Sequence, residues 1–127
     1  MEELILNNIN VNIQISPEAV NYYRKFETED GDKTVLYLIK DVTYHDGYSG
    51  SKGLVVDEQI VELKNRKGFY SFVEIICPKG TYYINKKNVK YIKPDKESKA
   101  NTMIYFIGLS TGLKIDAPYD FVKKNFI

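Results

Sequence analysis

The sequence is poor in the side chains that most metal and catalytic sites require. Its 127 residues include one cysteine and one histidine, and no tryptophan. A metal site needs several ligands that converge on one point, and catalysis by Cys77 would have only His45 as an imidazole base. Cys77 also ends an apolar run, VEIIC, where a cysteine usually packs as a small apolar side chain. We therefore expect no metal, no cofactor and no enzymatic activity.

Long apolar runs are absent as well. No window approaches the roughly 18 continuous apolar residues of a membrane helix, and the start, MEELILNN, lacks the basic and apolar regions of a secretory signal. A lone cysteine cannot form an internal disulfide, which favours a reducing cytoplasmic location. The length indicates a single domain over residues 1–127. The oligomeric state stays open, a homodimer included.

Charge is unevenly distributed along the chain. Residues 1–64 carry 6 Lys and Arg against 12 Asp and Glu, whereas residues 65–127 carry 12 against 5. Such asymmetry can indicate a basic binding face, but it is also explained if the two halves pair in the fold or solvate opposite faces.

The first half predicts strands and one helix. Alternation in NVNIQI, residues 10–15, indicates a strand. Ser16 suits a helix N-cap and Pro17 the first helical position, so the spacing of the apolar residues that follow predicts a helix over 16–26. The β-branched run 34–42 predicts a buried strand, and GLVVDEQIVEL predicts one or two more.

The second half predicts two hairpins. Residues 69–77 read as a strand, and Pro78-Lys79-Gly80 as a tight turn into TYYI. A short helical turn is expected in NKKNVKYI, then a hairpin around residues 110–112. A short terminal helix is expected after Pro118, with Phe121, Val122 and Phe126 on its buried side. The sum is an α+β fold, mostly antiparallel β, with two hairpins in the C-terminal half, one N-terminal helix and one short C-terminal helix.

One candidate binding loop is glycine-rich. The stretch YHDGYSGSKG offers His45, Tyr48, Ser49 and Lys52 as binding side chains. Its backbone N–H groups are able to bind an anion, although the phosphate-loop spacing is missing and no helix is indicated directly after it. The alternative is a plain loop between two strands.

A second candidate surface combines lysines with tyrosines. Lysines neutralise phosphates and tyrosine rings stack on bases, so this region predicts nucleic-acid binding. Alternation in TYYI would, however, bury one of its two tyrosines. The candidate residues, within the basic region Lys86–Lys99 and just before it, are Tyr82, Tyr83, Lys86, Lys87, Lys90, Tyr91 and Lys93.

The order of elements resembles two families. VNIQISPEAVNYYRKF, TVLYLIKDV with its glycine-rich loop, and MIYFIGLSTGLKIDAP resemble successive parts of the HesB-like proteins, the A-type iron–sulfur carriers. That family's chemistry depends on cysteines, but Tyr48 stands about where the first would fall, and none follows Pro118. The resemblance therefore implies a member without cluster ligands. In the C-terminal half, FVEIICPKGTYYINKKNVKYI followed by MIYFIGLSTGLKIDAPYDFVKKNFI is similar to the small flagellar FlbD family. This second resemblance implies a small β scaffold with no known enzymatic centre.

The sequence thus supports three hypotheses of function. The first is a small non-catalytic cytoplasmic binding protein of inhibitor, immunity or adaptor type, with a protein partner; eleven tyrosines suit such contacts. The second is a nucleic-acid-binding protein that uses the basic, tyrosine-containing region. The third is a degenerate iron–sulfur carrier-like protein.

Overall fold

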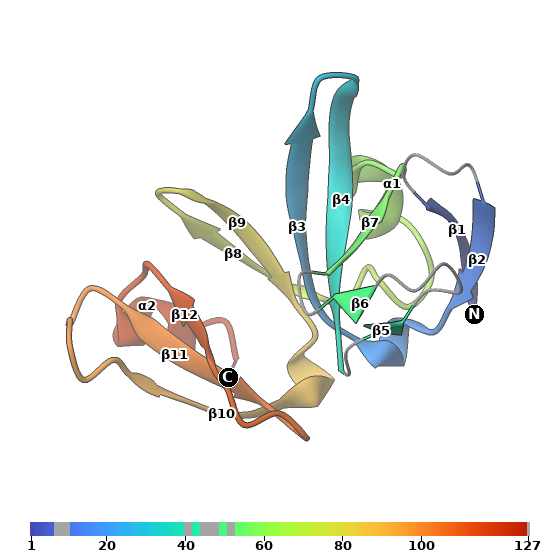
Figure 1. Ribbon diagram of the computed structural model, residues 1–127. Helices are drawn as coiled ribbons and strands as arrows, with labels where there is room; N and C mark the ends of the chain where they lie inside the picture. Colours follow the sequence, from blue (N-terminus) through green and yellow to red (C-terminus); the bar gives the residue numbers. More distant parts are fainter. Residues whose placement is uncertain (7–10, 40–41, 44–48, 51–52, 127) are drawn as a thin grey trace.

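The computed structural model describes residues 1–6, 11–39, 42–43, 49–50 and 53–126, with only the backbone described at 42–43 and 49–50 (Figure 1). Its strands are β1 Glu2–Leu6, β2 Val11–Ile15, β3 Val20–Thr28, β4 Gly31–Leu38, β5 Val42–Thr43, β6 Ser49–Gly50, β7 Leu54–Val56, β8 Val73–Cys77, β9 Gly80–Ile84, β10 Val89–Pro94, β11 Thr102–Phe106 and β12 Leu113–Ile115. Its helices are α1 Ile60–Lys64 and α2 Tyr119–Lys123, with the 3-10 turns η1 Pro17–Ala19 and η2 Lys86–Asn88. No helix of these residues is long and apolar enough to cross a membrane.

The described strands all pair antiparallel, which confirms the prediction of a mostly antiparallel β fold. The main sheet has seven strands in the order β2-β1-β7-β4-β3-β9-β8. A second sheet has the order β10-β11-β12, and β5 pairs with β6. Figure 1 shows β8 and β9 leaning away from β3 and β4, with the second sheet beside them.

The predicted N-terminal helix over residues 16–26 is wrong. Ser16 and Pro17 start only the single 3-10 turn η1, and the chain then continues as strand β3. A bulge between Val20 and Tyr22 places Val20 and Tyr23 in the same core although they are three residues apart. The bulge therefore gives part of this strand a helix-like apolar spacing. The structure's first α-helix is α1, in the middle of the chain.

Helix α1 occupies residues for which the sequence predicted strand. Gln59 and Glu62 form a capping box at its start, in which each side chain bonds the backbone of the other residue. Only Leu63 of the helix is buried. The capping box explains why a segment this short and rich in apolar residues leaves the sheet after β7.

The C-terminal half largely follows the prediction. Hairpin β8–β9 turns at Pro78 and Lys79, β11 pairs with β12, and the helical turn η2 is present. The predicted strand over 69–77 begins only at Val73. The terminal helix is α2, but Phe121 is 45% exposed, because Val122 is the residue of α2 that enters the core.

The buried residues form two cores. The first core joins β1, β2, β3, β4 and β7 to α1 and to the turn that follows it. Its residues are Leu4, Leu6, Ile15, Val20, Tyr23, Leu36, Leu54, Val56, Leu63, Phe69 and Phe72. The second core lies between hairpin β8–β9, the second sheet and α2. Its residues are Ile75, Cys77, Tyr82, Ile84, Ile104, Phe106, Ile115, Ala117 and Val122.

Strands β3 and β9 serve both cores because successive strand residues point to opposite faces. On β9, Tyr82 belongs to the second core, whereas Tyr83 packs against the first and stacks on Tyr23 with ring centroids 4.9 Å apart. On β3, Tyr22 packs against the second core and stacks on Tyr37, 4.3 Å away. Burial raises the pKa of Tyr22 and of Tyr23 well above the ordinary tyrosine value.

Three asparagines, which we call the asparagine clasp, fasten η2 to the start of β3. The Asn85 side chain donates to the Val20 carbonyl at 3.0 Å. The Asn88 side chain donates to the Glu18 carbonyl at 2.8 Å and to the Asn21 side-chain oxygen at 3.1 Å. Asn21 and Asn85 are buried, where an unpaired polar group is costly, and each has its partner. The clasp therefore joins segments that lie more than 60 residues apart in sequence.

The clasp also reaches the second sheet. The Asn85 side chain accepts from the backbone N–H of Lys87 and so caps η2. The carbonyl of Asn88 then accepts from the N–H of Ile107, just beyond β11. Both cores are thus fixed to the same short turn.

We predict that Asn85→Ala destabilises the protein by about 1–3 kcal/mol, because it removes the nearer side-chain donor of the Val20 carbonyl, at 3.0 Å, and leaves it only the longer bond from Asn88, at 3.4 Å. The free energy of unfolding in urea measures the change. Asn12→Ala is the matched control, since the Asn12 side chain bonds Glu3 at the exposed surface and its loss should change stability by at most about 0.5 kcal/mol. Equal effects of the two substitutions would contradict the assigned role of the clasp.

Candidate functional site

The glycine-rich loop falls largely outside the described residues. This holds for His45, Tyr48 and Lys52, whose proposed binding roles stay predictions. Ser49 belongs to β6 and pairs with Thr43 of β5, but its side chain is not described.

The predicted basic and aromatic surface is divided by the fold. Tyr82 is 8% exposed and lies in the second core, and Tyr83 faces the first core. They are neighbours on a strand, so they point to opposite faces of the sheet. Lys86 and Lys87 are exposed on η2. The two tyrosines and these lysines do not form one surface.

Part of that surface does come together on the second sheet. Tyr91 of β10 stacks on Tyr105 of β11 with ring centroids 4.7 Å apart. The Lys90 amine lies 5.9 Å from the Tyr91 ring, and the Lys93 amine 5.3 Å from the Tyr105 ring. We call these four residues the stacked pair and its lysines. Tyr105 was not among the residues predicted from sequence, because its contact with Tyr91 depends on how β10 and β11 pair.

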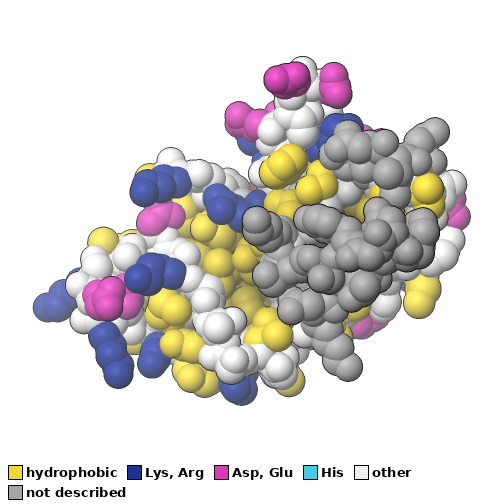
Figure 2. All heavy atoms as spheres, viewed as in Figure 1, with side chains coloured by type: hydrophobic (Ala, Val, Ile, Leu, Met, Phe, Trp, Pro, Cys, Tyr) yellow, Lys and Arg dark blue, Asp and Glu magenta, His cyan; other side chains and the backbone are white. Residues whose placement is uncertain are grey.

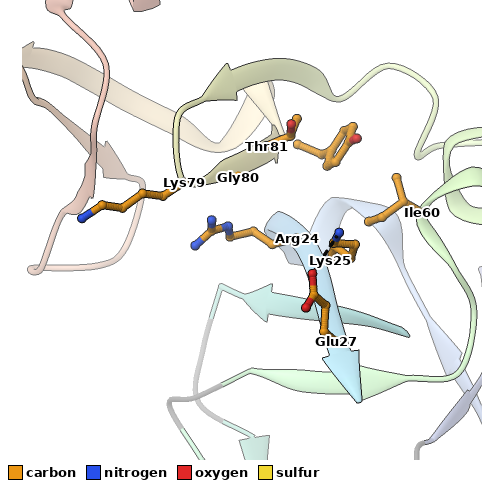
Figure 3. A pocket seen from close by; sticks show the side chains of 8 residues that line it. Arg24, Lys25, Glu27, Ile60, Lys79, Gly80 and Thr81 are labelled. Atoms are coloured by element: carbon orange, nitrogen blue, oxygen red, sulfur yellow. Dashed lines mark ion pairs between the residues drawn. The ribbon is translucent and has the colours of Figure 1, made fainter. Parts of the chain in front are cut away.

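A different site, absent from the sequence predictions, lies between β3 and β9. It is a cleft of about 410 Å³, bounded by β3, by the start of α1 and by the turn and first residues of β9 (Figure 3). We call it the β3–β9 cleft. Its lining residues are Arg24, Lys25, Glu27, Ile60, Lys79, Gly80, Thr81 and Tyr83.

The cleft exists because the pairing of β3 with β9 stops early. The N–H of Asn85 donates to the carbonyl of Asn21 at 2.8 Å, and Tyr23 pairs with Tyr83. In an antiparallel ladder, each step of two residues forward on one strand is a step of two backward on the other. The register of β3 with β9 covers only Tyr22 and Tyr23 of β3, although β3 continues to Thr28.

The rungs that would come next are missing. They would pair Lys25 with Thr81 and Glu27 with Lys79, and all four residues instead line the cleft. Backbone groups of a strand alternate between its two neighbours. Since Tyr23 pairs with β9, the N–H and C=O groups of Lys25 and Glu27 point toward the cleft rather than toward β4. On β9, Thr81 lies two residues from Tyr83, so its backbone groups likewise point into the cleft.

The two cores account for the divergence. Tyr82 and Ile84 of β9 pack in the second core, while the centre of β3 is held in the first core by Tyr23. Each hairpin follows the core that buries more of its side chains. Beyond Tyr23 and Tyr83 nothing in the described chain joins the two strands through a backbone ladder.

One wall of the cleft is basic. The Arg24 guanidinium lies over the Tyr82 ring, 3.9 Å from its centroid. Gly80 makes this close approach tolerable, because a Cβ at that position would lie 2.7 Å from Nη2 of Arg24. Figure 3 shows the Arg24 and Lys79 side chains extending in the same direction, away from Ile60.

The remaining charges of the cleft are partly balanced. Lys25 forms an ion pair with Glu27 at 3.1 Å, and the hydrogen bond between them raises the pKa of Lys25. In the part of the chain that the structure describes, no Asp or Glu lies within ion-pair distance of Arg24 or Lys79. Among the described lining residues, Arg24 and Lys79 are therefore the charges without an ion-pair partner, and the nearby Asp116 acts on the Tyr82 hydroxyl from outside the cleft.

The neighbourhood of the cleft offers little reactive chemistry. Cys77 is buried in the second core, and burial raises the pKa of its thiol. Burial likewise raises the pKa of the Tyr82 hydroxyl, so both groups stay protonated near neutral pH. Among the described residues, no three His, Cys, Asp or Glu side chains are grouped so as to hold a metal ion. What the cleft does offer is backbone hydrogen-bonding groups and positive charge.

Comparison of the chain with protein-family models, with curated proteins and with solved structures gives no match. The resemblances to the HesB-like and FlbD families accordingly stay predictions, and the function must be argued from the site itself.

Proposed function

We propose that this protein is a non-catalytic binding protein, of inhibitor, immunity or adaptor type, that acts by contact with another protein. An extended segment of the partner makes this contact by entering the β3–β9 cleft. The observation that carries the proposal is the interrupted ladder, which leaves the backbone groups of Lys25, Glu27 and Thr81 directed into the cleft.

Backbone groups at an unpaired strand edge recognise an extended chain. A peptide that adds a strand to such an edge gains main-chain hydrogen bonds, while pockets for alternate side chains supply specificity. The unpaired parts of β3 and β9 border the cleft on its two sides. One inserted strand would therefore lie between two neighbours of the seven-stranded sheet and hydrogen-bond to both of them. Its volume of about 410 Å³ suits a few residues of such a chain.

A library of displayed random peptides tests this proposal. We expect selection on the protein to enrich peptides that lose about tenfold or more in affinity for Thr81→Trp, which fills the cleft from β9. Thr81 is half-buried at the cleft wall, so the larger side chain is accommodated without a packed core being disturbed. Thr111→Trp, an exposed substitution on the β11–β12 hairpin, is the matched control and should leave affinity unchanged.

Two results would contradict the proposal. One is that selection enriches no peptide. The other is that the enriched peptides bind the Thr81→Trp and Thr111→Trp variants equally well, provided that circular dichroism shows both variants to be folded.

The stacked pair and its lysines favour a second candidate function, the binding of single-stranded nucleic acid. Tyr91 is 47% exposed and its ring is already held by Tyr105, so a base would stack on a fixed surface. Lys90 and Lys93 lie beside the two rings and would neutralise phosphates. Asp95 and Glu97 lie nearby, but both pair with Lys114.

We expect this candidate, if correct, to show oligonucleotide binding at about 50 mM salt that weakens steeply as salt is raised. Tyr91→Ala should weaken affinity about tenfold, the size expected for the loss of one stacking ring. Tyr70→Ala removes another exposed tyrosine, 71% exposed against 47% for Tyr91, outside this surface and is the control. The absence of binding at low salt, or equal losses in the two variants, would exclude this function.

A further inference from the structure

We infer that the β3–β9 cleft selects a particular class of segment, one in which acidic residues alternate with apolar residues. The inference rests on the proposed function, since it names the chemistry of the partner strand that enters the cleft. It follows from a difference between the two faces of the cleft.

The face on the side of the second core is basic. Arg24 lies on this face because it neighbours Tyr23, which faces the first core. Its guanidinium carbon lies 3.9 Å from the centroid of the Tyr82 ring, and Lys79 extends in the same direction (Figure 3). A planar guanidinium in a fixed position suits a carboxylate, which it can bind through two parallel hydrogen bonds.

The opposite face presents apolar side chains beside two ion pairs, Lys25 with Glu27 and Lys64 with Glu74. Ile60 of α1 and Tyr83 of β9 line the cleft there. Ile76 of β8 pairs with Thr81 on the same face and is 64% exposed, so apolar surface continues beyond the cleft. The charges of Lys25 and Glu27 on this face compensate each other.

A strand that enters the cleft would place its side chains on these two faces in turn, because successive residues of a strand point to opposite sides. Every second side chain would therefore meet Arg24 and Lys79, and those between would meet Ile60 and Tyr83. An alternating acidic and apolar sequence satisfies both faces with a single register. A sequence with the same composition in two blocks does not.

The surroundings of the cleft argue against a polyanion such as nucleic acid. Acidic side chains gather at the top of the molecule, over the tip of the β3–β4 hairpin (Figure 2). They are the exposed residues Glu29, Asp30 and Asp32, beside Glu27, which pairs with Lys25. A backbone with a negative charge at every unit would be repelled there, whereas a peptide needs carboxylates only beside Arg24 and Lys79.

Synthetic peptides of about eight residues, a length typical of a strand, test the inference. Their affinities are measured by fluorescence anisotropy for four sequences, namely alternating Glu and Val, alternating Gln and Val, alternating Lys and Val, and Glu and Val in two blocks. We expect the alternating Glu and Val peptide to bind about tenfold tighter than each of the others, and its advantage over the Gln and Val peptide to shrink as salt is raised.

Two double variants locate the effect. Arg24→Gln with Lys79→Gln should remove the preference for Glu over Gln. Lys96→Gln with Lys99→Gln removes the same charge from an exposed segment outside the cleft and should leave the preference intact.

The outcomes separate this inference from the proposed function. If all four peptides bind equally and Thr81→Trp weakens each of them, the cleft binds extended chains but the acidic and apolar class is wrong. If none of the four binds while display-selected peptides do, the class is again wrong and the proposed function stands. If neither synthetic nor selected peptides bind, the proposed function and the inference about the peptide class are both wrong.

Discussion

The structure depends on the asparagine clasp. Asn85 and Asn88 stand in one short turn, and their side chains donate hydrogen bonds to residues of η1 and of the start of β3. The carbonyl of Asn88, in the same turn, also accepts a hydrogen bond from the N–H of Ile107, beside the second sheet. Because buried amide groups are costly when unpaired, these contacts fix where β9 leaves β3 and how the second core sits against the first. No comparably buried side-chain network joins the two cores elsewhere in the described residues.

The β3–β9 cleft is a consequence of that arrangement. Near the clasp the two strands share a ladder, at Tyr23 and Tyr83. Farther from it β9 follows the second core and β3 follows the first, so the ladder opens. Beside this opening the Arg24 guanidinium lies over the Tyr82 ring, and Gly80 leaves room for it. The positive side chains of the cleft and its unpaired backbone groups thus have one origin. The neighbouring hairpins β3–β4 and β8–β9 pack mainly into different cores and therefore diverge.

Much of the C-terminal half could be predicted from sequence because its signals are local. Pro78-Lys79-Gly80 specifies a tight turn, and the apolar runs on either side of Ser110 and Gly112 are strands. The N-terminal prediction failed at β3, where Ser16 and Pro17 start a turn but a bulge then gives Val20 and Tyr23 a helix-like spacing. The cleft was beyond prediction, since it depends on contacts between residues such as Val20 and Asn85 that are distant in the chain.

Amide hydrogen exchange measured by NMR tests most directly whether the ladder opens beyond Tyr23. The N–H groups of Tyr23 and Tyr83 lie in the paired part of the ladder, and that of Asn85 donates to Asn21, so they should exchange slowly. The N–H groups of Lys25, Glu27 and Thr81 point into the cleft and should exchange much faster. If Lys25 and Thr81 are protected as well as Tyr23, then β3 and β9 are paired along their whole length and there is no cleft to fill.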